Sequence, residues 1–447
     1  MSRKSFRLLR NPALSLRILR HRLLLWSGAI AVALAAILFA RTSVLGNDLF
    51  GRAVRISPLL AYVITPAAFA AILWLTRSLF AGAEGSGIPQ TIAALQLPVL
   101  AQRRSVLSLR VAAGKILLTT LGLCAGASIG REGPTVQIGA AIMHNLGRWV
   151  HLPVKGMERA LVLAGGAAGI AAAFNTPLAG VVFAIEELSR SFEERTSGAV
   201  LTAVIVSGIG SMAVLGNYTY FGRTDAVLDL MQAWRPVLAC GIGGGLLGGL
   251  FARVLIGFSR GLPGRAGRWI GAHPVAFAAV CGLALAALGQ WSNDTVYGTG
   301  YQEARGLIEG GTSLPASFGL MKLGATVLSY ASGIPGGIFA PSLAVGAGLG
   351  ADVAHFLPGV PVGAVVILGM VGYFTGVVQA PITAVVIVME MTDNQALVIP
   401  LMATALIGFG VSKMVCPTSF YRALAQTFLE KMARRRDRPD AAPANPA

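Results

Sequence analysis

Charged side chains are scarce in this chain of 447 residues. They make up 12% of the sequence, while 55% is hydrophobic and the mean hydropathy is +0.69. Soluble domains carry about 25% charged residues. Acidic residues are especially few, at 19 against 36 Lys and Arg. The composition excludes an ordinary soluble globular protein and predicts an all-α polytopic membrane protein.

Cysteine and histidine are also rare, with four and five residues. They are scattered through the chain without the close spacing that metal sites use. Cysteine in apolar sequence packs like a small hydrophobic residue. We therefore expect no metal site and no cofactor. The residues concerned are Cys124, Cys240, Cys281, Cys416, His21, His144, His151, His273 and His355.

Basic residues gather at both ends, in an arm over residues 1–22 and a tail over 433–447. Cytoplasmic tails are enriched in Lys and Arg, so we expect a multi-pass protein of the cell (inner) membrane with both termini cytoplasmic. Basic tails would also suit nucleic acid. Attraction to membrane lipid explains them without a further assumption, so no nucleic-acid partner is expected.

The apolar runs between these tails place a transmembrane domain over residues 23–432. Helices are predicted over about 23–45 and 53–80, the second kinked at its prolines. Residues 293–312 are polar and glycine-rich, and read as an external or partly re-entrant segment. Many later runs fall below the 18 or so residues that span a bilayer. Such short, broken helices are typical of transporter cores.

An internal repeat supports a transporter architecture. The stretch from Gly130 to Ala140 aligns with that from Gly337 to Ala347, at an offset of 337 − 130 = 207. Pro177 and Glu186 align with Pro381 and Glu390, at an offset of 381 − 177 = 204. Two matches at nearly one offset predict two related halves, over about 53–216 and 229–412. The residues alone leave open whether the halves are parallel or inverted.

The stretch Gly130-Arg131-Glu132-Gly133-Pro134 lies between apolar runs, where a helix is about to begin. Proline suits the first turn of a helix, and the free N–H groups of a helix start attract anions. Glu132 could merely cap its own helix, which is worth roughly 1 kcal/mol. A carboxylate within a membrane costs at least about 2.5 kcal/mol. The balance favours a functional role, in which Glu132 and a small anion compete for one positive site.

Other polar residues have simpler alternatives. Arg131 is expected to hold carbonyls or a carboxylate, and Lys115 suggests function until a structural partner is found. Glu186 and Glu187 could be a solvated helix end, with Glu186 paired to Glu390 as structure and Glu187 the freer acid. In addition, Ser86 could merely cap a helix, and Tyr421 could be an interface aromatic residue.

Two enzyme-like motifs are set aside, and we expect no enzyme. Residues 126–130 satisfy G-x-S-x-G around Ser128, but that nucleophile motif needs a preceding strand and a histidine partner. Residues 243–248 satisfy G-x-G-x-x-G without a strand ahead of them, so close helix packing is the better interpretation.

Three loops together carry a family resemblance. Gly85-Ser86-Gly87-Ile88-Pro89, residues 130–134 and Gly337-Ile338-Phe339-Ala340-Pro341 match three signature motifs. Tyr421 stands in the matching place near the end of the last helix. The chain resembles the CLC chloride channel and transporter family, of the bacterial H+/Cl− exchange type, over roughly residues 20–432.

The resemblance implies a CLC fold of tilted, broken helices in two inverted repeats, and a homodimer with one pore per subunit. Glu132 would be the gate and external proton site, and Glu187 the internal proton-transfer residue. Lys115, Arg131 and Glu186 would lie near the pore with less certain roles. Chloride would be bound by Ser86, Gly87, Ile338, Phe339 and Tyr421.

Two functions remain within this family: a proton-coupled chloride antiporter, which we favour, and a passive channel. Glu187 favours the exchanger, because most channels of the family replace that residue. The sequence also departs from close bacterial relatives. Gln90 stands where they often have an acid, and Ser189 where an arginine is common.

Overall fold

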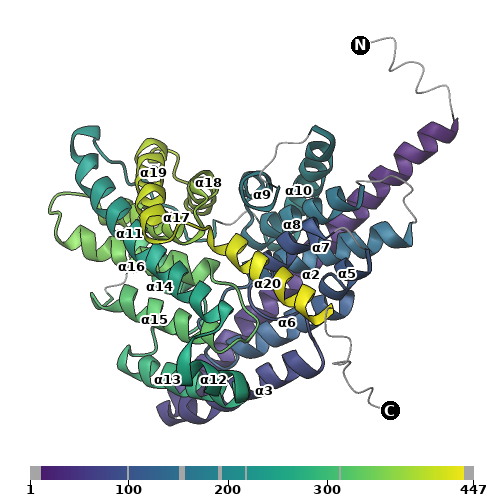
Figure 1. Cartoon of the computed structure of the whole chain (residues 1–447). Coiled ribbons are helices and arrows are strands. Elements are labelled where there is room, and N and C mark those ends of the chain that lie inside the picture. Colours follow the sequence, from purple (N-terminus) through teal and green to yellow (C-terminus); the bar gives the residue numbers. More distant parts are fainter. Residues whose placement is uncertain are drawn as a thin grey trace.

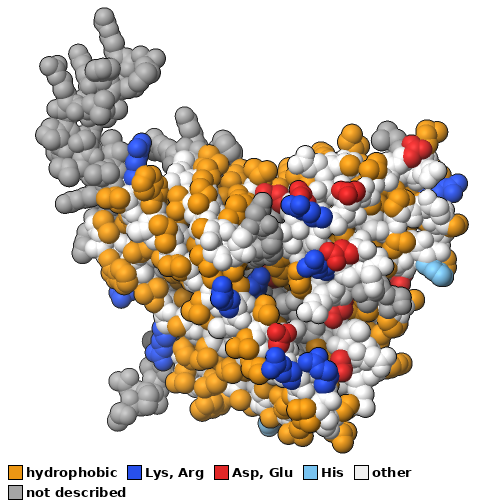
Figure 2. Space-filling view, turned by 180° about the vertical axis from the view of Figure 1, so that it is seen from behind, with side chains coloured by type: hydrophobic (Ala, Val, Ile, Leu, Met, Phe, Trp, Pro, Cys, Tyr) orange, Lys and Arg blue, Asp and Glu red, His pale blue; other side chains and the backbone are white. Residues whose placement is uncertain are grey.

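The computed structural model describes residues 12–97, 100–150, 157–189, 194–216, 219–311 and 314–436. Over these ranges the chain is built from helices and connecting turns (Figure 1). Eight of the described helices are long and apolar enough to cross a membrane. Charged side chains gather over the middle and right of the face seen in Figure 2, while its left part is largely hydrophobic. A lipid-facing surface has this character, because hydrocarbon replaces water as the solvent. Most of the predicted basic arm and the tail lie outside the described residues.

The first half of the chain supplies the helices that lie mainly on the right of Figure 1. A π-helical turn, η2 (Ala184–Ser189), follows α9. The helices are α2 (Pro12–Ile56), α3 (Ala61–Ser78), α4 (Ile88–Gln96), α5 (Leu100–Val106), α6 (Leu109–Leu123), α7 (Glu132–Trp149), α8 (Met157–Phe174), α9 (Pro177–Phe183) and α10 (Glu194–Leu215).

The second half lies mainly on the left, and its last helix, α20, crosses the middle of the molecule (Figure 1). Its helices are α11 (Leu230–Arg260), α12 (Gly264–Ala272), α13 (Pro274–Trp291), α14 (Tyr301–Glu309), α15 (Phe318–Ala331), α16 (Phe339–His355), α17 (Val362–Val378), α18 (Pro381–Thr392), α19 (Val398–Val415) and α20 (Phe420–Arg436).

Elements of the two halves correspond in order and length. Helices α3 and α13 each have 18 residues, and α4 and α14 each have nine. Corresponding helices also contact one another, since α3 packs against α13, α7 against α16 and α9 against α18. Contacts between equivalent elements are what a two-fold relation between the halves produces. The repeat limits of about 53–216 and 229–412, and the inverted orientation, remain our proposal.

At α9 and α18, two equivalent glutamates each cap the start of the helix in the other half. Glu186 accepts hydrogen bonds from the backbone N–H groups of Ile382 (3.2 Å) and Thr383 (2.6 Å), at the start of α18. Glu390 of α18 accepts them from Leu178 (3.1 Å) and Ala179 (2.7 Å), at the start of α9. Each helix therefore supplies the anionic cap of its counterpart, which helix starts favour.

Several element limits differ from the sequence prediction. The first helix runs from Pro12 to Ile56, well beyond 23–45, and α3 starts only at Ala61. A short 3-10 turn, Pro58–Leu60, separates them, because proline lacks the N–H that would continue the first helix. The polar segment 293–312 contains a helix, α14, which was not predicted because the segment has low hydropathy.

Candidate functional site

The three glycine-rich loops meet at one place. Gly130 and Gly337 exchange backbone hydrogen bonds of 2.6 and 2.7 Å, which join the second loop to the third. Gly336 donates to the Gly85 carbonyl at 3.1 Å, which joins the third loop to the first. Helices α4, α7 and α16 begin within these loops, at Ile88, Glu132 and Phe339. Their N-terminal ends therefore converge, and the partial positive charges of three helix starts act on one small volume.

Glycine is required where the loops approach most closely. A side chain at Gly133 would collide with Ser86 Oγ, and one at Gly130 with the Glu132 carboxylate. Ser86 thus lies against the first turn of α7. The Glu132 side chain folds back over the loop that precedes its own helix.

Glu132 is buried at the centre of this arrangement, with 0% of its surface exposed. Tyr220 donates a hydrogen bond to its Oε1 atom at 3.3 Å, and the Ala340 amide at the start of α16 points toward the carboxylate. Its Oε2 atom has no hydrogen-bond partner among the described residues. A buried carboxylate with an unsatisfied oxygen calls for an explanation, and a functional role is the usual one.

Two hydroxyl groups share this environment. Ser86 Oγ and the phenol of Tyr421 face one another, and both side chains are buried. Neither hydroxyl completes a hydrogen bond in the described part of the chain. Tyr421 lies at the start of α20, not near the end of the last helix as predicted, and its ring stacks on Phe339 of α16, with ring centroids 6.4 Å apart. The structure thus brings Ser86, Glu132, Phe339 and Tyr421 together, and Ile338 adjoins them as the N-cap of α16.

Gly87 lies in the same loop but has a different environment. Its φ angle is +101°, which glycine adopts without strain. Its N–H donates to Gln90 Oε1 at 3.0 Å, so a side chain already occupies the donor that was predicted to bind chloride. Gln90 also donates from Nε2 to the Glu84 carbonyl at 2.5 Å. The departure from relatives at position 90 therefore stabilises the loop that carries Ser86.

Lys115 has the structural partner that the sequence left open. Its fully buried ammonium group donates to the carbonyls of Ala83 (2.6 Å), Glu84 (3.2 Å) and Gly85 (2.8 Å). These carbonyls immediately precede the Ser86 turn. Lys115 thereby fixes the loop in front of α4.

Lys322 repeats this arrangement in the second half, at an offset of 322 − 115 = 207. It is also fully buried and donates to the carbonyls of Val296 (2.8 Å), Tyr297 (3.2 Å) and Gly298 (2.8 Å), ahead of α14. The sequence analysis did not single out Lys322. The offset of 207 already found for the glycine loops was the signal that could have found it.

We expect Lys322→Met to lower the free energy of unfolding by about 3 kcal/mol, because three buried carbonyls lose their donor at roughly 1 kcal/mol each. Thermal unfolding in detergent measures this loss. Arg305→Met is the matched control, since Arg305 forms an exposed i,i+4 pair with Glu309 and should change stability by less than about 0.5 kcal/mol. Equal melting of the two variants would contradict the structural role of Lys322.

The adjacent glutamates 186 and 187 have different environments. Glu187 is 1% exposed and lies within electrostatic range of Tyr421, in the π-helical turn η2. Such turns recur at functional sites. A solvated helix end is therefore wrong for Glu187. Glu186 instead caps α18, as described above, and the structure does not place its carboxylate among the three helix starts.

Ser128 does not have the surroundings of a nucleophile. It is fully buried, and its hydroxyl pairs with that of Thr326 at 3.0 Å. Its backbone N–H donates to Ser329 Oγ at 2.9 Å. Activation of a serine requires a general base as its partner, and these partners are hydroxyl groups. The G-x-S-x-G match lies in the turn and loop between α6 and α7, and Ser128 joins this loop to α15.

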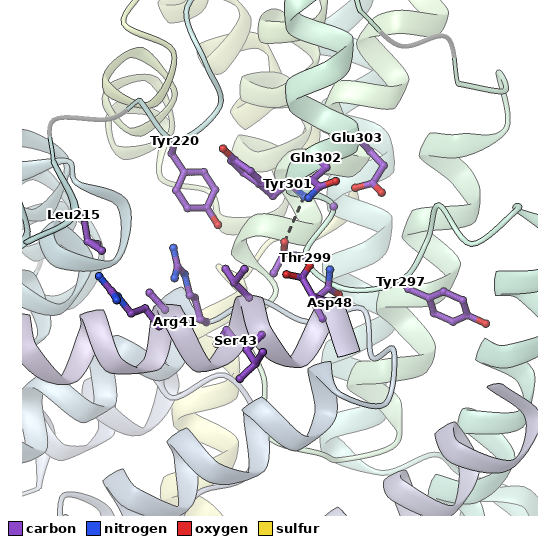
Figure 3. Close-up of a pocket in the computed structure, with 16 residues that line it drawn as sticks. Arg41, Ser43, Asp48, Leu215, Tyr220, Tyr297, Thr299, Tyr301, Gln302 and Glu303 are labelled. Carbon is purple, nitrogen blue, oxygen red and sulfur yellow. Dashed lines mark hydrogen bonds between the residues drawn. The ribbon is translucent and has the colours of Figure 1, made fainter. Parts of the chain in front are cut away.

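A cavity of about 650 Å³ is lined in part by Tyr220, the residue that donates a hydrogen bond to Glu132 (Figure 3). The exposed side chains of Arg41, Asp48 and Gln302 are part of its wall, so the cavity reaches the surface. Arg131 also lines it, and the Arg131 guanidinium lies 5.7 Å from the centre of the Tyr220 ring. Arg131, which precedes Glu132 in the chain, and Tyr220, which donates to the Glu132 carboxylate, therefore connect this cavity with Glu132.

The structure adds Tyr220 to the residues that the sequence analysis named. Tyr220 lies in the connection between the halves, and neither repeat nor motif marks it. It was missed because its importance rests on one contact, with a residue 88 positions away.

These features define a class of protein. A multi-pass helical protein with paired broken helices, whose starts converge on a buried carboxylate, has the architecture of an ion transporter. A family model described as "Voltage gated chloride channel" matches residues 67–413. The chain belongs to this family, the CLC family, and is a multi-pass membrane protein.

Known relatives and solved structures agree with this assignment. The H(+)/Cl(−) exchange transporter ClcA of Cronobacter sakazakii is 35% identical over 397 residues, 81% of this chain and 79% of that protein. ClcA of Salmonella paratyphi B is 34% identical over 419 residues, covering 85% and 83%. A slow cyanobacterial Cl−/H+ antiporter matches with a TM-score of 0.78 at 25% identity, covering 92% and 99%. A CLC-type fluoride/proton antiporter has a TM-score of 0.76 at 24% identity, covering 90% and 96%, which supports the fold.

Proposed function

We propose that this protein is a proton-coupled chloride antiporter. The observation that carries the proposal is the buried Glu132 carboxylate at three converging helix starts, beside the buried hydroxyls of Ser86 and Tyr421, which face one another. The name of its ClcA relatives, which describes H(+)/Cl(−) exchange, points the same way.

The proposed mechanism is competition for one positive site. Ionised Glu132 is attracted to the helix starts and occupies the place of a chloride ion. Once protonated, it loses most of that attraction and leaves the site, so chloride can enter. Because chloride and the carboxylate exclude each other, each proton taken up is linked to chloride movement.

Chloride binding is assigned to the groups around this site. The Ser86 and Tyr421 hydroxyls would donate to the ion, together with the backbone amides of Ile338 and Phe339 at the start of α16. A helix cannot satisfy its first N–H groups internally, so these amides suit an anion. We assign to Gly87 the turn that aims Ser86, because its own N–H donates to Gln90.

Proton movement needs a second carboxylate, and we propose Glu187. It is buried near Tyr421 and does not line the cavity that adjoins Arg131. In this proposal Glu132 exchanges its proton toward the outside and Glu187 toward the cytoplasm, with both termini cytoplasmic.

The test is transport in sealed vesicles that contain the purified protein. A chloride gradient is expected to drive protons against their own gradient, measured with a pH electrode and a potassium ionophore to clamp the voltage. Vesicles without protein are the control. Chloride movement without proton movement would identify a passive channel and overturn the antiporter proposal.

We also propose a homodimer. The surface near the reciprocal caps of α9 and α18 carries exposed apolar side chains that a second copy could cover. Stepwise photobleaching of singly labelled protein in liposomes should give two steps, and a majority of single steps would contradict the dimer. The side chains concerned are Leu178, Ile205, Ile209, Ile382, Ile399 and Leu406.

A further inference from the structure

The connection between the two halves reaches the gate through Tyr220. This residue is 4% exposed, although it belongs to a turn and not to a transmembrane helix. Its hydroxyl donates to Glu132 Oε1 at 3.3 Å. Tyr220 also lines the cavity, and in Figure 3 its hydroxyl end points inward while Tyr297 points away. The tyrosine therefore lies between the surface and the gate carboxylate.

The ring of Tyr220 is held by aromatic contacts from both halves. Its centroid lies 5.5 Å from that of Phe174 at the end of α8, and 5.0 Å from that of Tyr301 at the start of α14. Both contacts are edge-to-face, a favourable geometry for aromatic pairs. The neighbouring Phe221 ring adds a third contact at 5.0 Å. Because these contacts involve the ring alone, they do not depend on the hydroxyl group.

The turn itself is fixed to the end of α18. Phe221 donates its N–H to the Met391 carbonyl at 2.9 Å. Asn394 Nδ2 donates to the carbonyls of Thr224 (2.9 Å) and Ala226 (3.0 Å). Arg223 pairs with Asp393 at 3.1 Å, although this pair is exposed and contributes little. The second half thus fixes the turn that carries Tyr220, while Glu132 belongs to the first half.

Among the described residues, few charged or titratable groups interact with the Glu132 carboxylate. They are Arg131, which precedes it in the chain, Tyr220 from the connection, and Tyr421 from α20. The Ala340 amide of α16 adds an uncharged donor. Arg131 and the amide act on the carboxylate from the helix starts, whereas Tyr220 approaches it from the cavity.

We propose that Tyr220 is a positioning residue for the gate, which sets the pH at which Glu132 releases the anion site. This proposal rests on the competition mechanism proposed above. A phenol donates a stronger hydrogen bond to a carboxylate than to a protonated carboxyl group. Tyr220 therefore stabilises the ionised Glu132 that blocks the site. The bond is lost when Glu132 is protonated and moves away.

The test is Tyr220→Phe, which removes the hydroxyl and keeps the ring contacts. Without this donor, Glu132 is protonated more easily. The midpoint of acid-activated chloride transport should therefore move to higher pH, by about one unit or a tenfold change in proton affinity. Initial chloride efflux from vesicles across a pH series measures the midpoint. If Tyr220 had a purely structural role, the substitution would lower the transport rate without changing the midpoint pH.

Two further variants make the result decisive. Tyr301→Phe is the matched control, because Tyr301 belongs to the same ring cluster while its hydroxyl accepts a hydrogen bond from Arg305 at 3.2 Å. It should leave the midpoint unchanged. Adding Tyr220→Phe to Glu132→Ala should have no further effect, since the acceptor is gone. An unchanged midpoint in Tyr220→Phe, or an equal shift in Tyr301→Phe, would overturn the proposal.

The failure of this inference can be distinguished from failure of the antiporter proposal. Uphill proton movement in the unmodified protein, with no midpoint shift in Tyr220→Phe, would remove the role of Tyr220 and keep the antiporter. Chloride transport without proton movement would instead remove the antiporter itself.

Discussion

Glu132→Ala is expected to conduct chloride without moving protons. Alanine offers no carboxylate to compete with the ion, so the site stays accessible and chloride transport becomes independent of pH. Proton transport should fall by about 100-fold or more, the contribution typical of a positioned acid–base group. Chloride efflux and proton uptake, recorded in the same vesicle preparation, give both quantities.

The change is expected to affect coupling more than folding. Replacing Glu132 removes a buried carboxylate with an unsatisfied oxygen, which is costly to keep in a membrane. Glu309→Gln serves as a control, because that glutamate is exposed and pairs with Arg305 on α14. It should retain full coupling. Uphill proton transport that survived in Glu132→Ala would contradict the competition mechanism.

Glu187→Gln is expected to abolish proton transport as well, by a different route. Glutamine has nearly the same shape as glutamate and keeps hydrogen-bonding capacity, but it cannot carry a proton. Since Glu132 remains in place, chloride transport should still respond to pH. The expected loss of proton flux is again about 100-fold or more.

Glu186, the residue before Glu187, provides a control. Glu186→Gln should keep proton transport and lose stability, because its oxygens cap α18 through the N–H groups of Ile382 and Thr383. Weakening these charge-assisted bonds is expected to cost roughly 1–2 kcal/mol, visible as a lower melting temperature. The two variants thus have opposite predicted effects. Proton transport retained in Glu187→Gln and lost in Glu186→Gln would reverse our assignment of the two residues.

Sequence reasoning succeeded where a local pattern has a local physical meaning. The glycine and proline spacing at residues 130–134 predicted a helix start, and α7 begins at Glu132. The repeat offsets predicted related halves, whose equivalent helices contact one another. The membrane class and the CLC family were also predicted, and the comparisons confirm both.

The same reasoning failed where the outcome depends on packing. The first helix is much longer than predicted, and α14 lies in a polar segment in which no helix was predicted. Both predictions relied on hydropathy, which contains no information about how a helix packs against its neighbours. The sequence also gave no reason to separate Glu186 from Glu187 by burial. In the structure Glu186 caps α18 while Glu187 is buried, because consecutive residues of a helical turn point in different directions.

By itself the sequence determined that this protein lies in a membrane and that it has two related halves. It also determined that helices start at three glycine-rich loops, one of which carries Glu132. Those properties follow from composition and from short-range backbone preferences. The tertiary structure alone decided which groups surround that glutamate: a tyrosine from the connection, an amide from α16 and a phenol from α20. Hydrogen bonds depend on distances in space, and these partners lie between 88 and 289 positions away along the chain.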